Sequence, residues 1–279
     1  MSGTLYLCAT PIGNLGDVSA RCIEIFNTVD LIAAEDTRRT IQLLNHFGIS
    51  KPLTSYHEHN KREKGEYLIR LLKEGKNIAQ VSDAGTPAIS DPGEDLVKLC
   101  IENDITVTSI PGPVAGINAL ILSGLSTRRY AFEGFLSVNK RHRKEHLLSV
   151  KNDTHTLIFY EAPHKLKYTL ADMYEVLGDR KIALARELTK LHEEIIRTTL
   201  FEAQSLYDEK SPRGEYVIIV EGASEESIEP LENPWDGLSV TEHIDKYIAE
   251  GMTSKDAIKQ VSKERGLPKR DVYNEYHKS

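Results

Sequence analysis

The feature that most constrains the fold is a repeated unit, in which a short, mainly apolar run is followed at once by a turn rich in Gly and Pro. The run at 77–81 leads into residues 82–93, which contain two Gly, two Pro, two Asp and two Ser. The same unit recurs at 4–17 and at 105–116. Such turns continue neither a strand nor a helix, so each run is predicted to be a buried strand that ends in a polar loop.

These loops indicate where a ligand binds. Open α/β sheets hold their ligands at the carboxyl ends of the strands. A helix is predicted to begin near Glu94, so the free N–H groups of its first turn would lie close to the loop at 82–93. One such loop alone is as readily an ordinary turn, but three together favour a site built mostly from backbone.

The order of the segments predicts an α/β protein with two domains and a small C-terminal helical unit. Alternating strand and helix signals over 1–125 favour a parallel α/β domain. Residues 125–130 lack periodicity and mark the boundary to a mixed α+β domain at 126–222. In that second domain we expect strands at 156–160, 181–185, 195–200 and 215–220 and helices at 143–150 and 164–176.

Composition changes again after this domain. Residues 221–236 carry six acidic residues and no Lys or Arg, so 223–237 is predicted to be an acidic linker. Residues 238–279 contain three short helical patterns and read as a helix-turn-helix-like unit. Its expected core is Ile244, Tyr247, Ile248, Ala257, Ile258, Val261, Val272 and Tyr273. RNA binding, docking and dimer capping remain open as its role.

Several classes of protein are disfavoured. Three scattered cysteines and the absence of a signal-peptide pattern indicate a reduced, cytoplasmic protein with no membrane span. The chain has neither a Walker-type phosphate loop nor a complete Gly-x-Gly-x-x-Gly, which argues against a phosphotransferase or a dehydrogenase. His57 and His59 lack a third ligand at a suitable spacing, so no metal site is expected.

Charge gives a mixed indication about nucleic acid. The net charge of −7 argues mildly against a polyanionic partner. Its distribution matters more, because the run at 140–144 concentrates positive charge. Its phosphate-binding candidates are Lys140, Arg141, Arg143 and Lys144. The alternative for this run is a solvated surface.

The loops also carry a family resemblance. The segments are 9–17, 34–38, 82–93 and 111–115, followed by 56–60, 159–164, 185–190 and 213–216. Together they resemble the tetrapyrrole-methylase superfamily (class III methyltransferases) and, within it, the ribosomal RNA small subunit methyltransferase I family. The resemblance spans essentially the whole chain. It implies S-adenosylmethionine as cofactor and 2′-O-methylation of a cytidine ribose in the decoding region of 16S rRNA in the small ribosomal subunit. A homodimer is also expected, as is common among such relatives.

The resemblance further implies a methyl-donor site in a cleft between the two domains. Small residues there let backbone groups approach the ligand. The matched residues are Pro11, Gly13, Asp83, Ala84, Gly85, Thr86, Val114, Ala115 and Ala162. Many relatives have Ser or Thr where this chain has Val114 and Ala115, so only backbone contacts are expected at those two positions.

The acceptor side is less defined. A ribose hydroxyl is a weak acid, so a base or a cation near its oxygen assists transfer. We expect Arg38 and Arg39 to hold RNA phosphates, and one of Glu35, His59 or Lys190 to assist deprotonation. The alternative for each of these residues is a structural ion pair.

Two rival functions remain. A tetrapyrrole or diphthamide-pathway methyltransferase would keep the fold, but it would need neither the basic run nor the C-terminal unit. A non-catalytic RNA-binding assembly factor would have no use for the set of cofactor loops.

Overall fold

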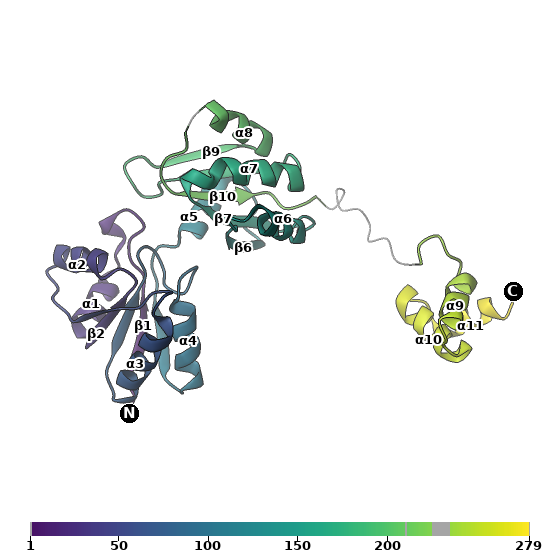
Figure 1. The fold of residues 1–279 in the computed structure, drawn as a ribbon, viewed down its shortest axis with the longest axis horizontal. Helices are drawn as coiled ribbons and strands as arrows, with labels where there is room; N and C mark the ends of the chain where they lie inside the picture. Colours follow the sequence, from purple (N-terminus) through teal and green to yellow (C-terminus); the bar gives the residue numbers. More distant parts are fainter. Residues whose placement is uncertain (1, 210, 225–234, 279) are drawn as a thin grey trace. The chain divides into compact units, whose positions relative to one another are not determined.

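The computed structural model describes residues 2–209, 211–224 and 235–278. They form two compact units, 1–223 and 224–279, which are considered separately. Unit 1–223 holds two five-stranded sheets (Figure 1). Among the described residues, no helix combines the length and the apolar character needed to cross a membrane.

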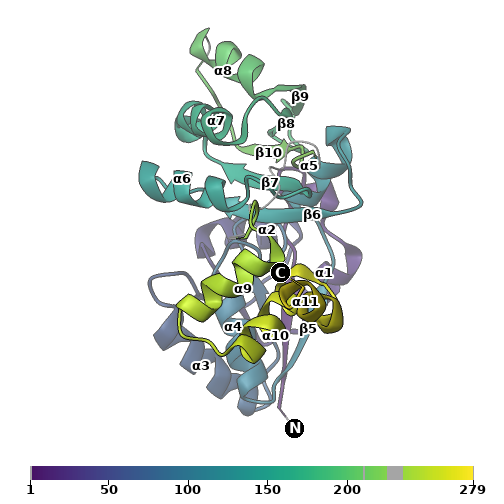
Figure 2. The same ribbon diagram turned by 90° about the vertical axis from the view of Figure 1, so that its right-hand side faces the viewer.

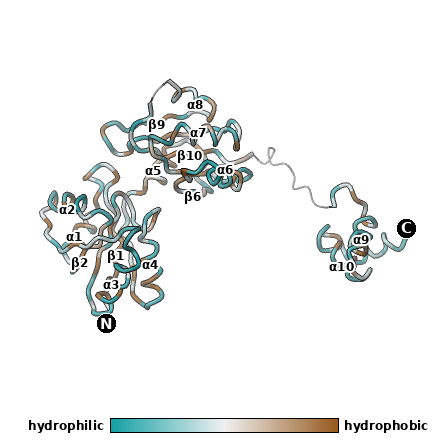
Figure 3. Tube along the Cα trace, in the orientation of Figure 1, coloured by the Kyte–Doolittle hydropathy of each residue, from teal (hydrophilic) through white to brown (hydrophobic). Residues whose placement is uncertain are grey.

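The first sheet is wholly parallel, as the alternating pattern predicts. Its strands lie in the order β3-β2-β4-β1-β5. The strands are β1 (Thr4–Cys8), β2 (Leu31–Ala34), β3 (Leu53–Ser55), β4 (Ile78–Val81) and β5 (Thr106–Ile110). Figure 3 shows brown, hydrophobic stretches in the region of β1 and β2, and both β2 and β4 are buried throughout. Burial on both faces is typical of a parallel sheet that is covered by helices on each side.

Helices cover both faces of this sheet because side chains alternate along each strand. Leu5 and Leu7 pack against α3 (Lys61–Lys73) and α4 (Gly93–Glu102). Cys8 packs on the other face, against α1 (Ala20–Thr28) and α2 (Thr37–His46).

The second sheet is mixed, in the order β6-β7-β10-β8-β9. Its strands are β6 (Tyr130–Phe135), β7 (Thr156–Glu161), β8 (Lys181–Arg186), β9 (Glu194–Thr199) and β10 (Tyr216–Val220). Leu157 and Phe159 face α6 (Lys140–Ser149), α7 (Pro163–Leu177) and α8 (Leu200–Glu209). Ile158, between them in the sequence, faces the opposite side. Figure 2 shows α6 and α7 on this second sheet.

Helix α5 (Ala115–Ser123) covers that opposite face. Its Ala119 and Leu120 pack with Ile158, Ala183 and Val217 of the second sheet. The sequence pattern predicts this helix as part of the first domain, with a boundary at residue 125. The packing shows that the chain joins the second sheet's core earlier, directly after β5. The whole of 1–223 accordingly forms one compact unit.

The segments that the sequence analysis did not predict are α2, β3, β6 and α8. Strands β3 and β6 lie at the edges of their sheets. No residue of β3 is fully buried, and only Gly134 is buried in β6. Edge strands need no continuous apolar run, so the pattern that identified the central strands is absent there. The expected strand at 195–200 ends at Thr199, and Leu200 instead opens α8.

One buried ion pair ties α6 to α7. The side chains of Arg143 and Asp172 are 8% and 6% exposed, and their closest N–O distance is 2.6 Å. Arg143 Nη1 also donates to the carbonyls of Ser137 and Val138. All of this residue's charge is therefore used inside the fold, whereas the sequence analysis assigns it to RNA.

The unit at 224–279 holds the three expected helices, α9 (Val240–Ala249), α10 (Ser254–Arg265) and α11 (Lys269–Tyr276). Ser239 and Glu242 form a capping box at the start of α9. Seven of the eight expected core residues lie in the core or pack against it, but Tyr273 is 52% exposed. Val240 and Tyr276, which were not expected, join the cluster. Of the predicted linker, residues 225–234 lie outside the described part of the chain.

The Arg143 pair gives a prediction about stability. Arg143→Met leaves the buried Asp172 carboxylate with only Lys144 Nζ, 4.0 Å from its other oxygen, so the free energy of unfolding should fall by about 3 kcal/mol. The control is Arg141→Met on the same helix, where an exposed pair with Glu145 is lost and the change should stay within about 0.5 kcal/mol. Chemical denaturation monitored by circular dichroism measures both. Equal losses in the two variants would contradict this role of Arg143.

Candidate active site

The strand order brings the predicted loops together. Strands β2, β4, β1 and β5 are consecutive in the sheet and parallel. The loops after them therefore follow one another along a single edge. The three Gly- and Pro-rich loops that the sequence analysis singled out are those after β4, β1 and β5. The start of α2, after β2, adds a fourth segment.

Hydrogen bonds link these loops to one another. Thr10, after β1, exchanges backbone hydrogen bonds with Gly85, after β4, at 2.9 and 3.1 Å. Thr86 Oγ1 donates to the carbonyl of Pro113, after β5, at 3.0 Å. Three separate connections thus form one continuous backbone wall.

A network of carboxylates joins the β2 and β4 loops. Asp83 Oδ1 accepts the backbone N–H of Asp36, and the N–H of Asp83 points to Glu35 Oε2. The other oxygen of Asp83, Oδ2, lies 3.2 Å from Arg39 Nη1. Burial raises the pKa of Glu35 above its usual range, and the nearby charges of Asp83 and Asp91 add to that effect. Arg38, by contrast, hydrogen-bonds the carboxylate of Asp36 and holds its pKa at about 2.

The loop at 82–93 is held in a strained conformation. Ala88 and Ser90 have φ values of 68° and 63°, in the left-handed region that side chains other than Gly disfavour. Asp91 Oδ1 accepts the backbone N–H groups of Ala88 and Gly93, which stabilises the turn. Burial raises the pKa of Asp91. Backbone strain held in place by surrounding contacts is typical of ligand-binding loops.

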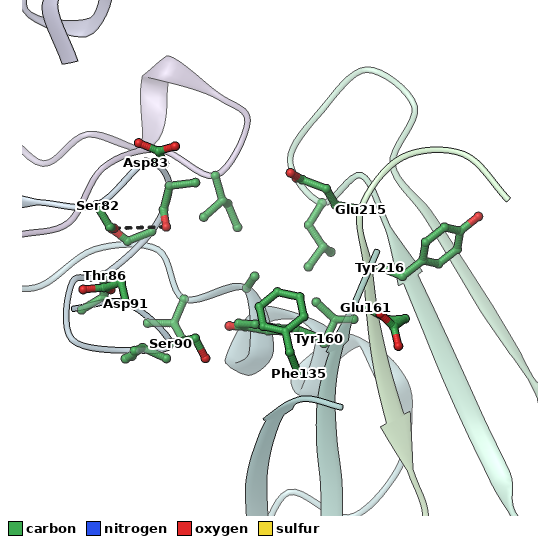
Figure 4. A pocket seen from close by; sticks show the side chains of 18 of the residues that line it. Ser82, Asp83, Thr86, Ser90, Asp91, Phe135, Tyr160, Glu161, Glu215 and Tyr216 are labelled. Carbon is green, nitrogen blue, oxygen red and sulfur yellow. Dashed lines mark hydrogen bonds between the residues drawn. The ribbon is translucent and has the colours of Figure 1, made fainter. Parts of the chain in front are cut away.

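A pocket of about 490 Å³ opens between the two sheets, within unit 1–223 (Figure 4). Ser82, Asp83, Thr86, Ser90 and Asp91 line one side. The other side comes from the second sheet, where the ends of β6, β7 and β8 and the start of β10 meet at one edge.

Two aromatic residues of that second wall were missed by the sequence analysis. The rings of Phe135 and Tyr160 pack edge to face with their centroids 5.5 Å apart, and both residues line the pocket. The Tyr160 hydroxyl accepts the N–H of Gly116 in the first turn of α5 at 3.0 Å. Burial raises the pKa of this hydroxyl. Tyr160 lies within the segment 159–164 that carries the resemblance, but Phe135 ends the unpredicted strand β6 and had no sequence signal.

The structure divides the predicted donor-binding residues between two pockets. Those that line the 490 Å³ pocket are Asp83, Ala84, Gly85, Thr86, Val114, Ala115 and Ala162. Pro11 and Gly13 line a neighbouring pocket of about 310 Å³ between the β1 loop and α2. The two pockets share Ser82, Asp83 and Arg39 as a common wall.

The three candidate bases lie in different places. Glu35 lines the larger pocket. His59 is exposed and lines neither pocket. Lys190 Nζ bridges Glu187 and Glu215, each at 3.0 Å. Burial lowers the pKa of Lys190, but the hydrogen bonds to the two carboxylates outweigh it and raise the pKa overall. Lys190 is thus kept as a cation, and Glu35 is the one of the three candidates that lines the larger pocket.

The RNA-binding candidates also separate. Arg39 lines both pockets and is 65% exposed, while Arg38 is exposed beside it. The run at 140–144 opens helix α6 and lines neither pocket. There Lys140 and Arg141 are exposed, and Lys144 pairs with Glu175. Within the described ranges, no group of His, Cys, Asp and Glu has the arrangement of a metal site.

The two sheets and their shared pocket define the class of protein. Residues 4–204 match the family described as Tetrapyrrole (Corrin/Porphyrin) Methylases. Two solved structures share the fold. Diphthine synthase superposes with a TM-score of 0.60 at 13% identity, over 79% of this chain and 90% of that one. Uroporphyrin-III C-methyltransferase from Thermus thermophilus, complexed with S-adenyl homocysteine, superposes with a TM-score of 0.56 at 14% identity. The match covers 78% of this chain and 97% of that one. The chain thus has the class III methyltransferase fold.

Full-length relatives narrow the class. The protein named ribosomal RNA small subunit methyltransferase I is 54% identical in Halalkalibacterium halodurans, over 99% of this chain and 95% of that protein. The protein of the same name in Bacillus subtilis is 49% identical, over 99% of this chain and 94% of that protein. The protein of the same name in Synechocystis is 47% identical, over 97% of this chain and 96% of that protein. The chain belongs to the ribosomal RNA small subunit methyltransferase I family, as the motifs suggested.

The β1 loop supports a second stability prediction. A Cβ at Gly13 would lie 2.4 Å from Lys190 Cγ and 2.9 Å from the carbonyl oxygen of Leu188. Gly13→Ala should therefore force this loop away from the turn at 187–190 and cost about 1–3 kcal/mol of stability. Gly16→Ala is the control, since its nearest contact is a side-chain oxygen of Asn14 at 3.2 Å. Thermal unfolding of the two variants tests the difference. An equal midpoint for both would show that the loop is not held at Gly13.

Proposed function

We propose that the protein transfers a methyl group from S-adenosylmethionine to the ribose 2′-hydroxyl of a cytidine in the decoding region of 16S rRNA in the small ribosomal subunit. The cofactor expected from the sequence is that of the family to which the chain belongs. The observation that carries the proposal is the pair of adjoining pockets with a common wall at Ser82, Asp83 and Arg39. A reaction between two substrates needs two such sites in contact.

The larger pocket fits the donor. Its lining includes Ala84, Gly85, Ala115 and Ala162, whose small side chains leave backbone groups accessible. Phe135 and Tyr160 offer an aromatic surface to a planar base. The carboxylates of Asp83 and Asp91 suit a ligand that carries positive charge. When bound, S-adenosylmethionine supplies a methyl group activated by a positively charged sulfur.

The smaller pocket suits the acceptor nucleotide. Gln42 and Thr40 offer hydrogen-bonding groups, and Pro11 and Leu43 offer apolar contacts. Arg39, on the shared wall, is positioned to hold a phosphate next to the reacting ribose. In this proposal Pro11 and Gly13 act on the acceptor side and not in donor binding.

Glu35 is the proposed base. Its carboxylate lines the donor pocket beside Asp83, and burial brings its pKa closer to neutrality than that of a solvated glutamate. Arg39 is close enough to Asp83 to limit the build-up of negative charge there. Lys190 acts as a positioning cation through Glu215, which also lines the donor pocket.

Some of the expectations concern the protein as a whole. We propose a cytoplasmic homodimer, since a second copy would enlarge the surface available to a folded RNA. Sedimentation velocity of the purified chain tests the dimer. The rival function, methylation of a small tetrapyrrole-like or diphthamide-pathway substrate, draws support from the fold shared with uroporphyrin-III C-methyltransferase and diphthine synthase.

The first experiment asks which substrate is methylated. Purified protein, labelled S-adenosylmethionine and small subunits that lack the modification should yield label on the ribose of one decoding-region cytidine. Nuclease digestion and mass spectrometry locate the label. Label on a base, or transfer to a small molecule in place of rRNA, would overturn the proposed function.

A pocket-filling variant tests the donor site. Ala115→Leu adds bulk to the lining without removing a backbone donor, so calorimetric affinity for S-adenosylmethionine should fall by about tenfold or more. The control is Ile117→Leu, which keeps an apolar residue at an exposed position of the same helix. Unchanged affinity in Ala115→Leu would place the donor elsewhere.

The pH dependence tests Glu35. A base must be deprotonated, so the rate should rise with pH and level off above the raised pKa of Glu35. Glu35→Gln should lower kcat by about 100-fold or more and abolish this rise, with donor affinity retained. Asp36→Asn is the control. The pKa of Asp36 is about 2, so removal of this carboxylate should not shift the rise of the rate with pH. A rise that persists in Glu35→Gln would exclude Glu35 as the base.

A further inference from the structure

Helix α11 exposes an aromatic pair that the small helical unit does not use for its core. The rings of Tyr273 and His277 lie 4.3 Å apart, and the Tyr273 side chain is 52% exposed. The helix core on this side is completed by Val272, which is fully buried, and by Tyr276. A tyrosine that could pack inward instead lies on the solvent side of α11, next to a histidine.

Two cations share that face. With about 100° between successive residues of an α-helix, Lys269, Tyr273, His277 and Arg270 span an arc of about 100°. Val272 and the acidic residues Asp271 and Glu275 fall outside this arc. We call these four residues the α11 face.

The cations of the α11 face are available to a ligand. Lys269 and Arg270 are exposed, and neither forms an ion pair with a residue in the described part of the chain. By contrast, Arg265 near the end of α10 is held by the carbonyls of Leu238 and Ser239. In this unit Arg265 is therefore part of the fold, whereas Lys269 and Arg270 remain open to a ligand.

Helix α11 is also held firmly enough to present these groups together. The Tyr276 hydroxyl donates a hydrogen bond to the Asp245 carboxylate of α9 at 3.0 Å. In the first turn of α11, the backbone N–H of Asp271 donates to the carbonyl of Pro268. A fixed aromatic surface loses less conformational entropy on binding than a mobile one.

We propose that the α11 face binds a single-stranded segment of RNA, with a base stacked on Tyr273 and His277 and neighbouring phosphates on Lys269 and Arg270. This inference rests on the proposed rRNA substrate but adds a second contact, outside the methyl-transfer site. Exposed aromatic rings beside free cations are the combination that binds unpaired nucleotides, because every base has a face that can stack. A duplex keeps its bases stacked on one another and offers this surface only phosphates.

The test uses the full chain and a short, fluorescently labelled oligouridine at low salt. Tyr273→Ala combined with His277→Ala should lower the affinity by about tenfold. Tyr273→Phe keeps the ring and should bind within about twofold of the unmodified chain. Tyr168→Ala, which removes a 69% exposed tyrosine on α7, is the control and should have no effect.

A salt titration tests the cations. Lys269→Ala combined with Arg270→Ala should reduce the slope of log affinity against log salt by about 1.4, since each phosphate contact on a single strand contributes about 0.7. The matched control is Lys255→Ala with Lys259→Ala, which removes the same charge from exposed positions of α10. An equal reduction in both double variants would mean general attraction to the unit, and it would overturn the assignment to the α11 face.

Other outcomes also overturn the proposal. Unchanged oligouridine affinity in the aromatic double variant would show that the α11 face is not an RNA site and leave it to a protein partner. A matching RNA duplex bound as tightly as oligouridine, with the same sensitivity to Tyr273→Ala, would exclude stacking of an unpaired base.

The methyl-transfer assay separates this inference from the proposed function. The α11 variants should raise KM for small subunits while leaving kcat at saturation and the affinity for S-adenosylmethionine unchanged. A chain that binds oligouridine through the α11 face but methylates no rRNA would retain this inference and overturn the function. Normal methylation with no change in KM would contradict the α11 face as a substrate contact.

Discussion

The site depends on the order of four parallel strands. Because β2, β4, β1 and β5 are neighbours, the loops that follow them meet at one edge of the sheet. The backbone pair between Thr10 and Gly85, and the hydrogen bond from Thr86 to Pro113, then fix these loops to one another. Backbone contacts of this kind do not depend on side-chain identity. Val114 and Ala115, which offer no side-chain hydroxyl, can therefore line the pocket at this edge.

The second sheet adds the other wall and converts this edge into a pocket. Helix α5 follows directly from the β5 loop and packs on the second sheet through Ala119 and Leu120. The Tyr160 hydroxyl then meets the first turn of the same helix. The connection between the two sheets is therefore itself part of the pocket wall, and any shift of one sheet relative to the other would change the pocket.

Charge is distributed between structure and site by burial. Arg143 and Asp172 neutralise each other inside the fold, and neither is available to a ligand. Glu35, Asp83 and Arg39 lie in the pocket walls, where partial burial raises the pKa of Glu35 and the ion pair remains open to solvent on one side. The same residue types thus stabilise the fold in one place and line a pocket in the other. The difference is set by their packing, which the order of residues in the chain does not reveal.

The sequence by itself determined the parallel first sheet, the central strands of the second, the three C-terminal helices and the loops at the site, because burial and turn formation leave local patterns. It did not reveal the edge strands β3 and β6, whose exposed residues need no apolar run. Only the tertiary structure shows that Phe135 lines the larger pocket and that Pro11 and Gly13 line the smaller one. It also shows that Arg143 is buried in an ion pair. Each of these depends on contacts between residues far apart in the chain, such as Arg143 with Asp172, and local sequence carries no record of them.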